Sequence, residues 1–277
     1  MPSYWKRPVW ILMVCLMAAL GALYVGQRHL IYFPTRISHA QFEGGVKAIF
    51  GARRSILAPF DAIVIEPPAD TPVQATAILF HGNAGLGLDR GHFAPVFAQR
   101  GVRLIIAEYP GYGARGGAPT ERMLVEDADA LYAAVSRRYP DVPIWLVGES
   151  LGAGVSVQVA ARQSARPPSR LVLLTPFMSL SETAARAYRF LPVRYLVKDR
   201  FDSAGQLQHF AGPVAILIAE QDEVVGAAQG RALAQVSRAR GPTVSVEIAG
   251  AGHNSWSVLI TDAQWTQLLG SPTAPQS

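Results

Sequence analysis

The sequence predicts an α/β domain in which helices cover both faces of a mostly parallel sheet, with an apolar helix ahead of it at the N-terminus. Two observations predict this class. From about Asp61 onward, apolar runs of strand length alternate with longer segments of helical character. The runs are almost continuous in apolar residues, which is typical of parallel strands buried on both faces.

The predicted elements follow one another in a regular order. Strands are expected at residues 62–66, 76–80, 103–108, 144–147, 171–174, 214–219 and 244–248. Helices are expected at residues 89–99, 121–138, 151–163, 227–238 and 256–268. Ligands of such sheets bind at the carboxyl ends of the strands, so the residues that follow each strand are the candidates for function.

The N-terminal segment, residues 1–29, is predicted to be a membrane anchor. Lys6 and Arg7 precede an apolar run from Val9 to Val25, which is at the lower limit of length for a bilayer span. Positive charge ahead of the span predicts a cytoplasmic N-terminus and an extracytoplasmic domain. The alternative is a signal peptide cleaved near residues 19–21, which would give a secreted protein. The apolar run continues past that site, which favours an uncleaved anchor.

Two further segments depart from the alternating pattern. Residues 176–212 hold no strand candidate and are expected to form a short lid with two short helices. Arg186, Tyr188 and Arg189 in this lid are expected on a solvated face, with contact to the substrate as the alternative. The tail, residues 271–277, is rich in Ser, Pro, Thr, Ala and Gln and is expected to be disordered. Residues 30–270 therefore form the expected domain.

Composition limits the classes of function. The single cysteine, Cys15, excludes an intramolecular disulfide and a cysteine-based metal cluster. The net charge is +5, but the basic residues are scattered and form no nucleic-acid-binding block. We therefore expect no nucleic-acid partner, no metal and no organic cofactor.

The strand at 144–147 leads into a G-x-S-x-G motif, Gly-Glu-Ser-Leu-Gly at residues 148–152. A strand before the motif and a helix of small residues after it are the context of a nucleophile elbow, in which the backbone of the serine is strained. Gly148 and Gly152 would allow the tight turn. Ser150 is therefore the candidate nucleophile, and the N–H of Leu151, at the helix N-terminus, is a candidate oxyanion donor.

A second donor is expected from the loop after the strand at 76–80, which reads His-Gly-Asn-Ala-Gly at residues 81–85. In elbow-type hydrolases this loop gives a backbone N–H to the oxyanion. Position favours Asn83, with Ala84 as the alternative. His81 lies directly ahead of the donor loop and is expected to have a structural role.

A nucleophilic serine needs a base, and the base needs an orienting acid. Asp222 follows the strand at 214–219 and His253 follows the last strand, in the order Ser, Asp, His that this arrangement requires. Glu220 and Glu223 compete for the role of the acid. Asp222 is favoured because it lies further into the loop than Glu220 and just ahead of the helix.

These motifs together resemble the alpha/beta-hydrolase superfamily, in particular its membrane-anchored serine hydrolases related to serine aminopeptidases and monoacylglycerol lipases. The matching stretches are residues 30–34, 81–85, 109–113, 148–152, 221–225 and 252–254. The resemblance implies an alpha/beta-hydrolase fold with Ser150 as nucleophile, Asp222 as acid and His253 as base. It also implies that residues 109–113 form a loop beside the active site. Glu220 and Gln221 stand where relatives usually have a small residue, and Gly226 stands where they often have Pro.

The expected activity is hydrolysis of an acyl ester or thioester through an acyl-enzyme intermediate, with a small acyl substrate. A peptidase of aminopeptidase type is one alternative, although the lid carries more Arg than carboxylate to hold an amine. The other is a non-catalytic, membrane-anchored binding protein on a hydrolase fold. The resemblance also implies that residues 199–202, Asp199, Arg200, Phe201 and Asp202, form a segment that packs the lid onto the core, with Asp202 structural.

Overall fold

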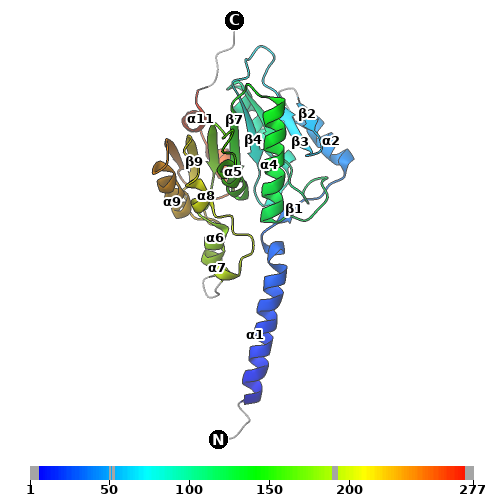
Figure 1. The fold of residues 1–277 in the computed structure, drawn as a ribbon, viewed down its shortest axis with the longest axis vertical. Coiled ribbons are helices and arrows are strands. Elements are labelled where there is room, and N and C mark those ends of the chain that lie inside the picture. Colours follow the sequence, from blue (N-terminus) through cyan, green and yellow to red (C-terminus); the bar gives the residue numbers. More distant parts are fainter. Residues whose placement is uncertain (1–5, 50, 52–53, 189–192, 272–277) are drawn as a thin grey trace.

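The computed structural model describes residues 6–49, 51, 54–188 and 193–271. In these residues eight strands form one sheet, in the order β10-β9-β8-β7-β4-β6-β3-β2 (Figure 1). Their bounds are β2 (Arg54–Leu57), β3 (Ala62–Ile65), β4 (Ala75–Phe80), β6 (Val102–Ile106), β7 (Ile144–Glu149), β8 (Arg170–Leu174), β9 (Val214–Ala219) and β10 (Thr243–Ile248).

The predicted mostly parallel sheet is confirmed. The strands from β10 to β6 pair in parallel, and β3 and β2 join antiparallel at the edge beside β6. All seven predicted strands are present. The eighth, β2, went unpredicted because its residues are mostly exposed and include Arg54 and Ser55, so they form no apolar run.

Helices cover both faces of the sheet, as expected. The first face carries α4 (Glu121–Arg138), α5 (Leu151–Arg162), α8 (Ser203–Leu207) and α9 (Ala227–Arg238). The second carries α2 (His39–Ala48), α3 (Ala94–Ala98), α10 (Trp256–Leu259) and α11 (Asp262–Leu269). Strand β4 serves both layers, because Ile78 packs into the first core and Leu79 into the second.

Two predicted helices are broken in the structure. The segment predicted as one helix at 89–99 is a 3-10 helix, η3 (Gly87–Phe93), followed by α3. Pro95 explains the restart, since proline is accepted in the first turn of a helix but not in its interior. The helix predicted at 256–268 is divided into α10 and α11, where Thr261 starts the second helix with a capping box to Gln264.

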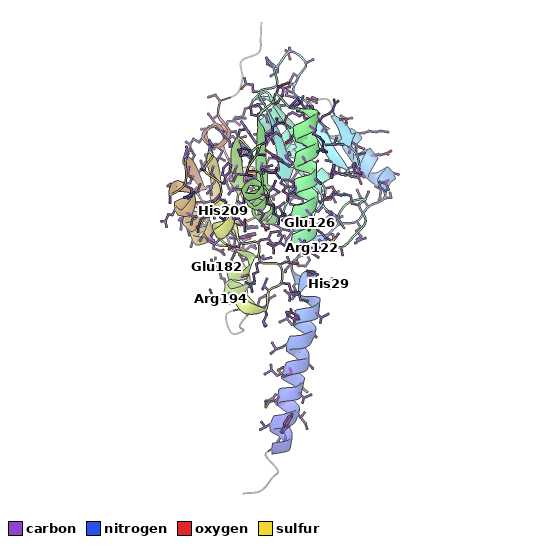
Figure 2. All side chains as sticks on the ribbon, in the orientation of Figure 1. His29, Arg122, Glu126, Glu182, Arg194 and His209 are labelled. Atoms are coloured by element: carbon purple, nitrogen blue, oxygen red, sulfur yellow. The ribbon has the colours of Figure 1, made fainter. Side chains whose placement is uncertain are left out.

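The N-terminal helix α1 (Lys6–Gly26) projects from the domain and continues into the 3-10 helix η2 (Gln27–Leu30) (Figure 1). Figure 2 shows the side chains of its lower turns standing clear of the domain, with His29 at the junction. The stretch Pro8–Leu30 contains an 18-residue window with a mean hydropathy of 2.3 and is long and apolar enough to be a candidate membrane span. A signal sequence passes the same test of length and composition, so the choice between an uncleaved anchor and a cleaved signal peptide stays a prediction.

The lid has more helices than the two that were expected. Its described residues form α6 (Leu180–Ala187), α7 (Val193–Leu196) and α8. Asp202 caps the N-terminus of α8 by accepting a hydrogen bond from the N–H of Gly205, which agrees with its expected structural role. Helices α6 and α7 lie at the end of the domain from which α1 projects (Figure 1). Arg189 and most of the tail, residues 272–277, lie outside the described residues.

Candidate active site

The G-x-S-x-G motif forms a tight turn between β7 and α5. Ser150 has φ 51° and ψ −110°, which places a non-glycine residue at positive φ. A Cβ at Gly148 would collide with the backbone of Gly152, and one at Gly152 would collide with the carbonyl of Phe80. The two glycines are therefore required by close backbone approaches, as the sequence predicted, and the serine side chain is held out beyond the sheet.

Ser150, His253 and Asp222 lie in one chain of hydrogen bonds. Ser150 Oγ lies 2.9 Å from His253 Nε2, and His253 Nδ1 lies 2.7 Å from Asp222 Oδ2. His253 and Asp222 are each only 7% exposed. An ionised Asp222 only accepts, so the ring donates from Nδ1 and its Nε2 accepts from the serine hydroxyl. The structure thus brings the three predicted residues together in the geometry of a nucleophile, base and orienting acid.

The carboxylate of Asp222 is kept ionised by its loop. Its Oδ1 accepts from the backbone N–H groups of Val224, Val225 and Gly226 at 2.7–3.1 Å. Burial alone would raise the pKa of this carboxyl. The hydrogen bond and charge of His253 and the backbone donors outweigh burial, and the pKa is lowered from its usual value.

The two competing acids occupy other positions. Glu220 accepts from the N–H of Gly250 at 2.7 Å, and Glu223 accepts from the backbone N–H of His253 at 3.1 Å. Neither bond reaches the imidazole ring. Both carboxylates therefore support the loop that carries His253, while Asp222 alone among the three predicted candidates contacts the ring.

Gly226, which departs from the proline of relatives, is explained by the geometry of the acid loop. Its φ is 91°, which proline cannot adopt, and its N–H is one of the three donors to Asp222. A Cβ there would collide with the guanidinium of Arg186, which donates from α6 to the carbonyl of Val225 at 2.9 Å. Arg186 is exposed, as expected for a solvated face, and its guanidinium also links the lid to the acid loop.

The two predicted oxyanion donors lie beside the serine. Leu151 is the first residue of α5, and both Leu151 and Asn83 line the cavity that contains Ser150. Ala84, the alternative donor, lies in strand β5 (Ala84–Gly85), which pairs with β1 (Phe33–Pro34) and does not line this cavity. The geometry favours Asn83 over Ala84.

The chain that follows η2 holds the Asn83 loop in place. Phe33 N–H donates to the carbonyl of Asn83 at 2.9 Å, and the side-chain amide of Asn83 donates to the carbonyl of Ile31 at 2.8 Å. The hydroxyl of Tyr112 donates to the same Asn83 carbonyl at 2.8 Å. These bonds hold the carbonyl and the side chain of Asn83, so they fix the position of this loop beside Ser150.

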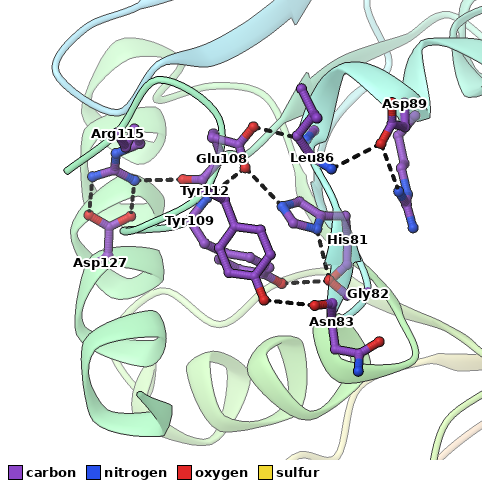
Figure 3. Close-up of polar contacts among 12 residues, drawn as sticks. His81, Gly82, Asn83, Leu86, Asp89, Glu108, Tyr109, Tyr112, Arg115 and Asp127 are labelled. Atoms are coloured by element: carbon purple, nitrogen blue, oxygen red, sulfur yellow. Dashed lines mark hydrogen bonds and ion pairs between the residues drawn. The ribbon is translucent and has the colours of Figure 1, made fainter. Parts of the chain in front are cut away.

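A buried polar cluster supports this loop (Figure 3). Glu108 Oε1 lies 3.0 Å from His81 Nε2 and accepts from the N–H of Tyr109, while Oε2 accepts from the N–H of Gly87. The hydroxyl of Tyr109 donates to the carbonyl of His81 at 2.9 Å. The structural role expected for His81 is confirmed by its full burial. Glu108 was missed, because only its partners in space distinguish it from other strand-end carboxylates.

An apolar cavity of about 280 Å³ opens above Ser150, slightly smaller than common small-molecule pockets of about 300–1,000 Å³. Its walls come from the strand ends, from α6 and α7, and from the last turns of α1. Tyr188 is 47% exposed, as expected for a solvated face, and it also lines this cavity. The contribution of α1 could not be predicted, because the apolar run gives no indication of which of its turns meets the domain.

Comparison with known proteins agrees with this architecture. The family described as serine aminopeptidase, S33, matches residues 71–205. An uncharacterized protein of Mycobacterium tuberculosis strain H37Rv is 31% identical over 84% of this chain and 82% of its own length. The chain belongs to the alpha/beta-hydrolase superfamily.

Two further similar proteins match either less of the chain or the fold alone. The lysophosphatidylserine lipase ABHD12 of Danio rerio is 34% identical over 56% of this chain and 45% of its own length, so this hydrolase spans about half of that relative. The structure of the Pyrococcus furiosus esterase Pf2001 superposes with a TM-score of 0.62 at 16% identity, covering 84% of this chain and 96% of the esterase. That likeness concerns the fold.

Proposed function

We propose that this alpha/beta hydrolase is a serine hydrolase that cleaves an acyl ester or thioester through an acyl-enzyme intermediate. The observation that carries the proposal is the hydrogen-bonded chain from Ser150 through His253 to Asp222, which ends in an apolar cavity. The lipase and esterase names of similar proteins support the same chemistry.

In the proposed mechanism, His253 Nε2 takes the proton of Ser150 as Oγ attacks the carbonyl carbon of the substrate. The N–H groups of Leu151 and Asn83 stabilise the oxyanion that forms. Asp222, ionised and held by backbone donors, fixes the imidazole tautomer and stabilises the imidazolium. The imidazolium then protonates the leaving alcohol or thiol, and water, activated by His253, releases the acid from Ser150.

The cavity favours an ester over a peptide. An aminopeptidase needs an anion to hold the amino group of its substrate, and among the described residues that line this cavity there is no carboxylate. The non-catalytic alternative leaves no reason for the strained φ of Ser150 or for the three donors on Asp222.

We also propose that α1 anchors the enzyme in a membrane, with a cytoplasmic N-terminus and the domain on the opposite side. Its composition supports this orientation, since Lys6 and Arg7 precede the apolar stretch Pro8–Leu30. Protease added to sealed, right-side-out spheroplasts should digest the domain. Digestion only after lysis would reverse the orientation, and recovery of the domain in the soluble fraction would indicate cleavage.

Turnover of a series of 4-nitrophenyl esters by the purified full chain tests the activity. We expect Ser150→Ala to lower kcat by at least about a thousandfold, because the covalent step is lost. Ser181→Ala, on α6 and outside the cavity lining, is the matched control and should retain activity. Equal turnover by wild type and Ser150→Ala, with both folded by circular dichroism, would reject the proposed nucleophile.

A further inference from the structure

One face of α1 meets the domain, and it does so at the active-site cavity. Leu20, Leu23 and Tyr24 of α1 and Gln27 at the start of η2 all line the cavity that contains Ser150. The spacings 20–23, 20–24, 23–27 and 24–27 are three or four residues, as for positions on one face of a helix. Val25, on the other side at the same depth, is 77% exposed. The helix therefore directs a defined stripe of side chains, Leu20, Leu23, Tyr24 and Gln27, toward the site.

Polar bonds fix the upper end of this stripe against the lid. The side-chain amide of Gln27 donates to the carbonyl of Leu196 at 3.2 Å, and its oxygen accepts from the N–H of Lys198 at 2.8 Å. Arg28 makes two hydrogen bonds to Asp199, whose carboxylate is only 5% exposed. Because a buried carboxylate needs its partner, these contacts hold α1 and the lid in one register.

The lower end of the cavity lies at the level of the apolar stretch. Leu20 and Leu23 fall within the candidate span Pro8–Leu30 and face α6 and α7 across the cavity. From Leu20 to Gln27 the helix rises about 10 Å, at 1.5 Å per residue. The cavity thus connects the serine to a depth at which an anchored α1 would be surrounded by lipid chains.

We propose that the last turns of α1 are a wall of the substrate pocket, where Leu20 and Leu23 contact the distal part of the substrate's acyl chain. The chain reaches Ser150 laterally from the bilayer, between α1 and the α6–α7 pair. The anchor thereby sets the preferred acyl length as well as the location of the enzyme. This inference rests on the proposed ester hydrolysis, and it makes α1 a determinant of specificity.

The test compares Leu23→Trp with Val25→Trp in the full chain, reconstituted in phosphatidylcholine vesicles. Both variants add an indole to the same turn of α1, but only the first places it in the cavity. The readout is kcat/KM for 4-nitrophenyl hexadecanoate divided by that for 4-nitrophenyl butanoate. Leu23→Trp should lower this ratio at least about tenfold, since each methylene excluded from an apolar site costs roughly a factor of four. Val25→Trp should leave it unchanged.

An equal ratio in all three proteins would overturn the inference while leaving the proposed function intact. Absence of turnover for every ester would reject the proposed function instead. A second measurement, which needs no catalysis, then tests whether α1 forms a wall of the pocket. In Ser150→Ala, a diazirine-bearing hexadecanoic acid should crosslink to residues 20–27, 180–188 and 193–197, and Leu23→Trp should suppress this labelling. Crosslinks spread evenly along α1, unaffected by Leu23→Trp, would contradict the proposal.

Discussion

The two ends of the cavity are built differently. At the serine end, each reacting group is fixed by several hydrogen bonds from loops at the ends of buried strands, as Asp222 and the Asn83 loop show. At the far end, apolar side chains of α1, α6 and α7 enclose the space, and few polar bonds hold them in register. On the proposed function, this difference teaches that the chemistry depends on preorganised donors, whereas the proposed selection of the acyl chain depends on packing between two separate segments.

The largest effect is expected at the serine end from Asp222→Asn. The amide cannot hold the required tautomer of His253, so kcat should fall about 10⁴-fold, as in other triads. Glu223→Gln keeps a carbonyl oxygen for the N–H of His253 and should retain most of the activity. Ester turnover measures both. A comparable loss in Glu223→Gln would show that the acid is misassigned.

A smaller effect is expected from the cluster beneath the oxyanion loop. Glu108 uses both oxygens to accept three hydrogen bonds, and an amide in its place leaves a buried N–H facing a donor. Glu108→Gln should lower kcat by roughly ten- to a hundredfold, less than the loss of a whole donor, with little change in KM.

Glu66→Gln is the matched control, because Glu66 pairs with Arg103 at the opposite end of β6. Its kcat should not change. If both variants lost the same stability and the same activity, the effect of Glu108 would be one of folding.

At the far end, removing the ion pair between Arg28 and Asp199 should affect the stability of the protein more than its catalytic rate. Arg28→Met leaves Asp199 buried without its cation, but Arg28 is 43% exposed, so solvent reduces the cost to about 1 kcal/mol. This lowers the Tm by about 2–4 °C for a domain of this size. Arg122→Met breaks an exposed pair with Glu126 on α4 (Figure 2) and should leave the Tm unchanged. Equal Tm shifts in Arg28→Met and Arg122→Met would show that the Arg28–Asp199 pair does not stabilise the protein.

The smallest effect is the acid dependence of stability. The pKa of Asp222 is lowered in the folded protein, so the ionised carboxylate adds stability above the unfolded-state pKa of about 3.9. That contribution is lost as the pH falls through the lower folded-state pKa. The Tm difference between wild type and Asp222→Asn at pH 7 should therefore narrow in strong acid. A difference independent of pH would contradict the lowered pKa.

The serine end could be predicted from the sequence because each of its parts follows a strand and carries a motif. Ser150 was placed by the G-x-S-x-G motif after a strand, and Asp222 and His253 were placed by strand ends and chain order. Glu108 and the stripe on α1 were not, because their roles come from contacts between segments far apart in the chain. The breaks at Pro95 and Thr261 were missed although their signals, a proline and a capping box, are local.

The most direct test of the account is labelling of the full chain in vesicles with ethyl and hexadecyl fluorophosphonates, followed by mass spectrometry. We expect one adduct, on Ser150, that forms faster with the hexadecyl probe, and that this advantage is lost in Leu23→Trp but kept in Val25→Trp. Adducts on another residue, or none on a folded protein, would contradict Ser150 as the nucleophile. An advantage that survives in Leu23→Trp would contradict the role of the anchor.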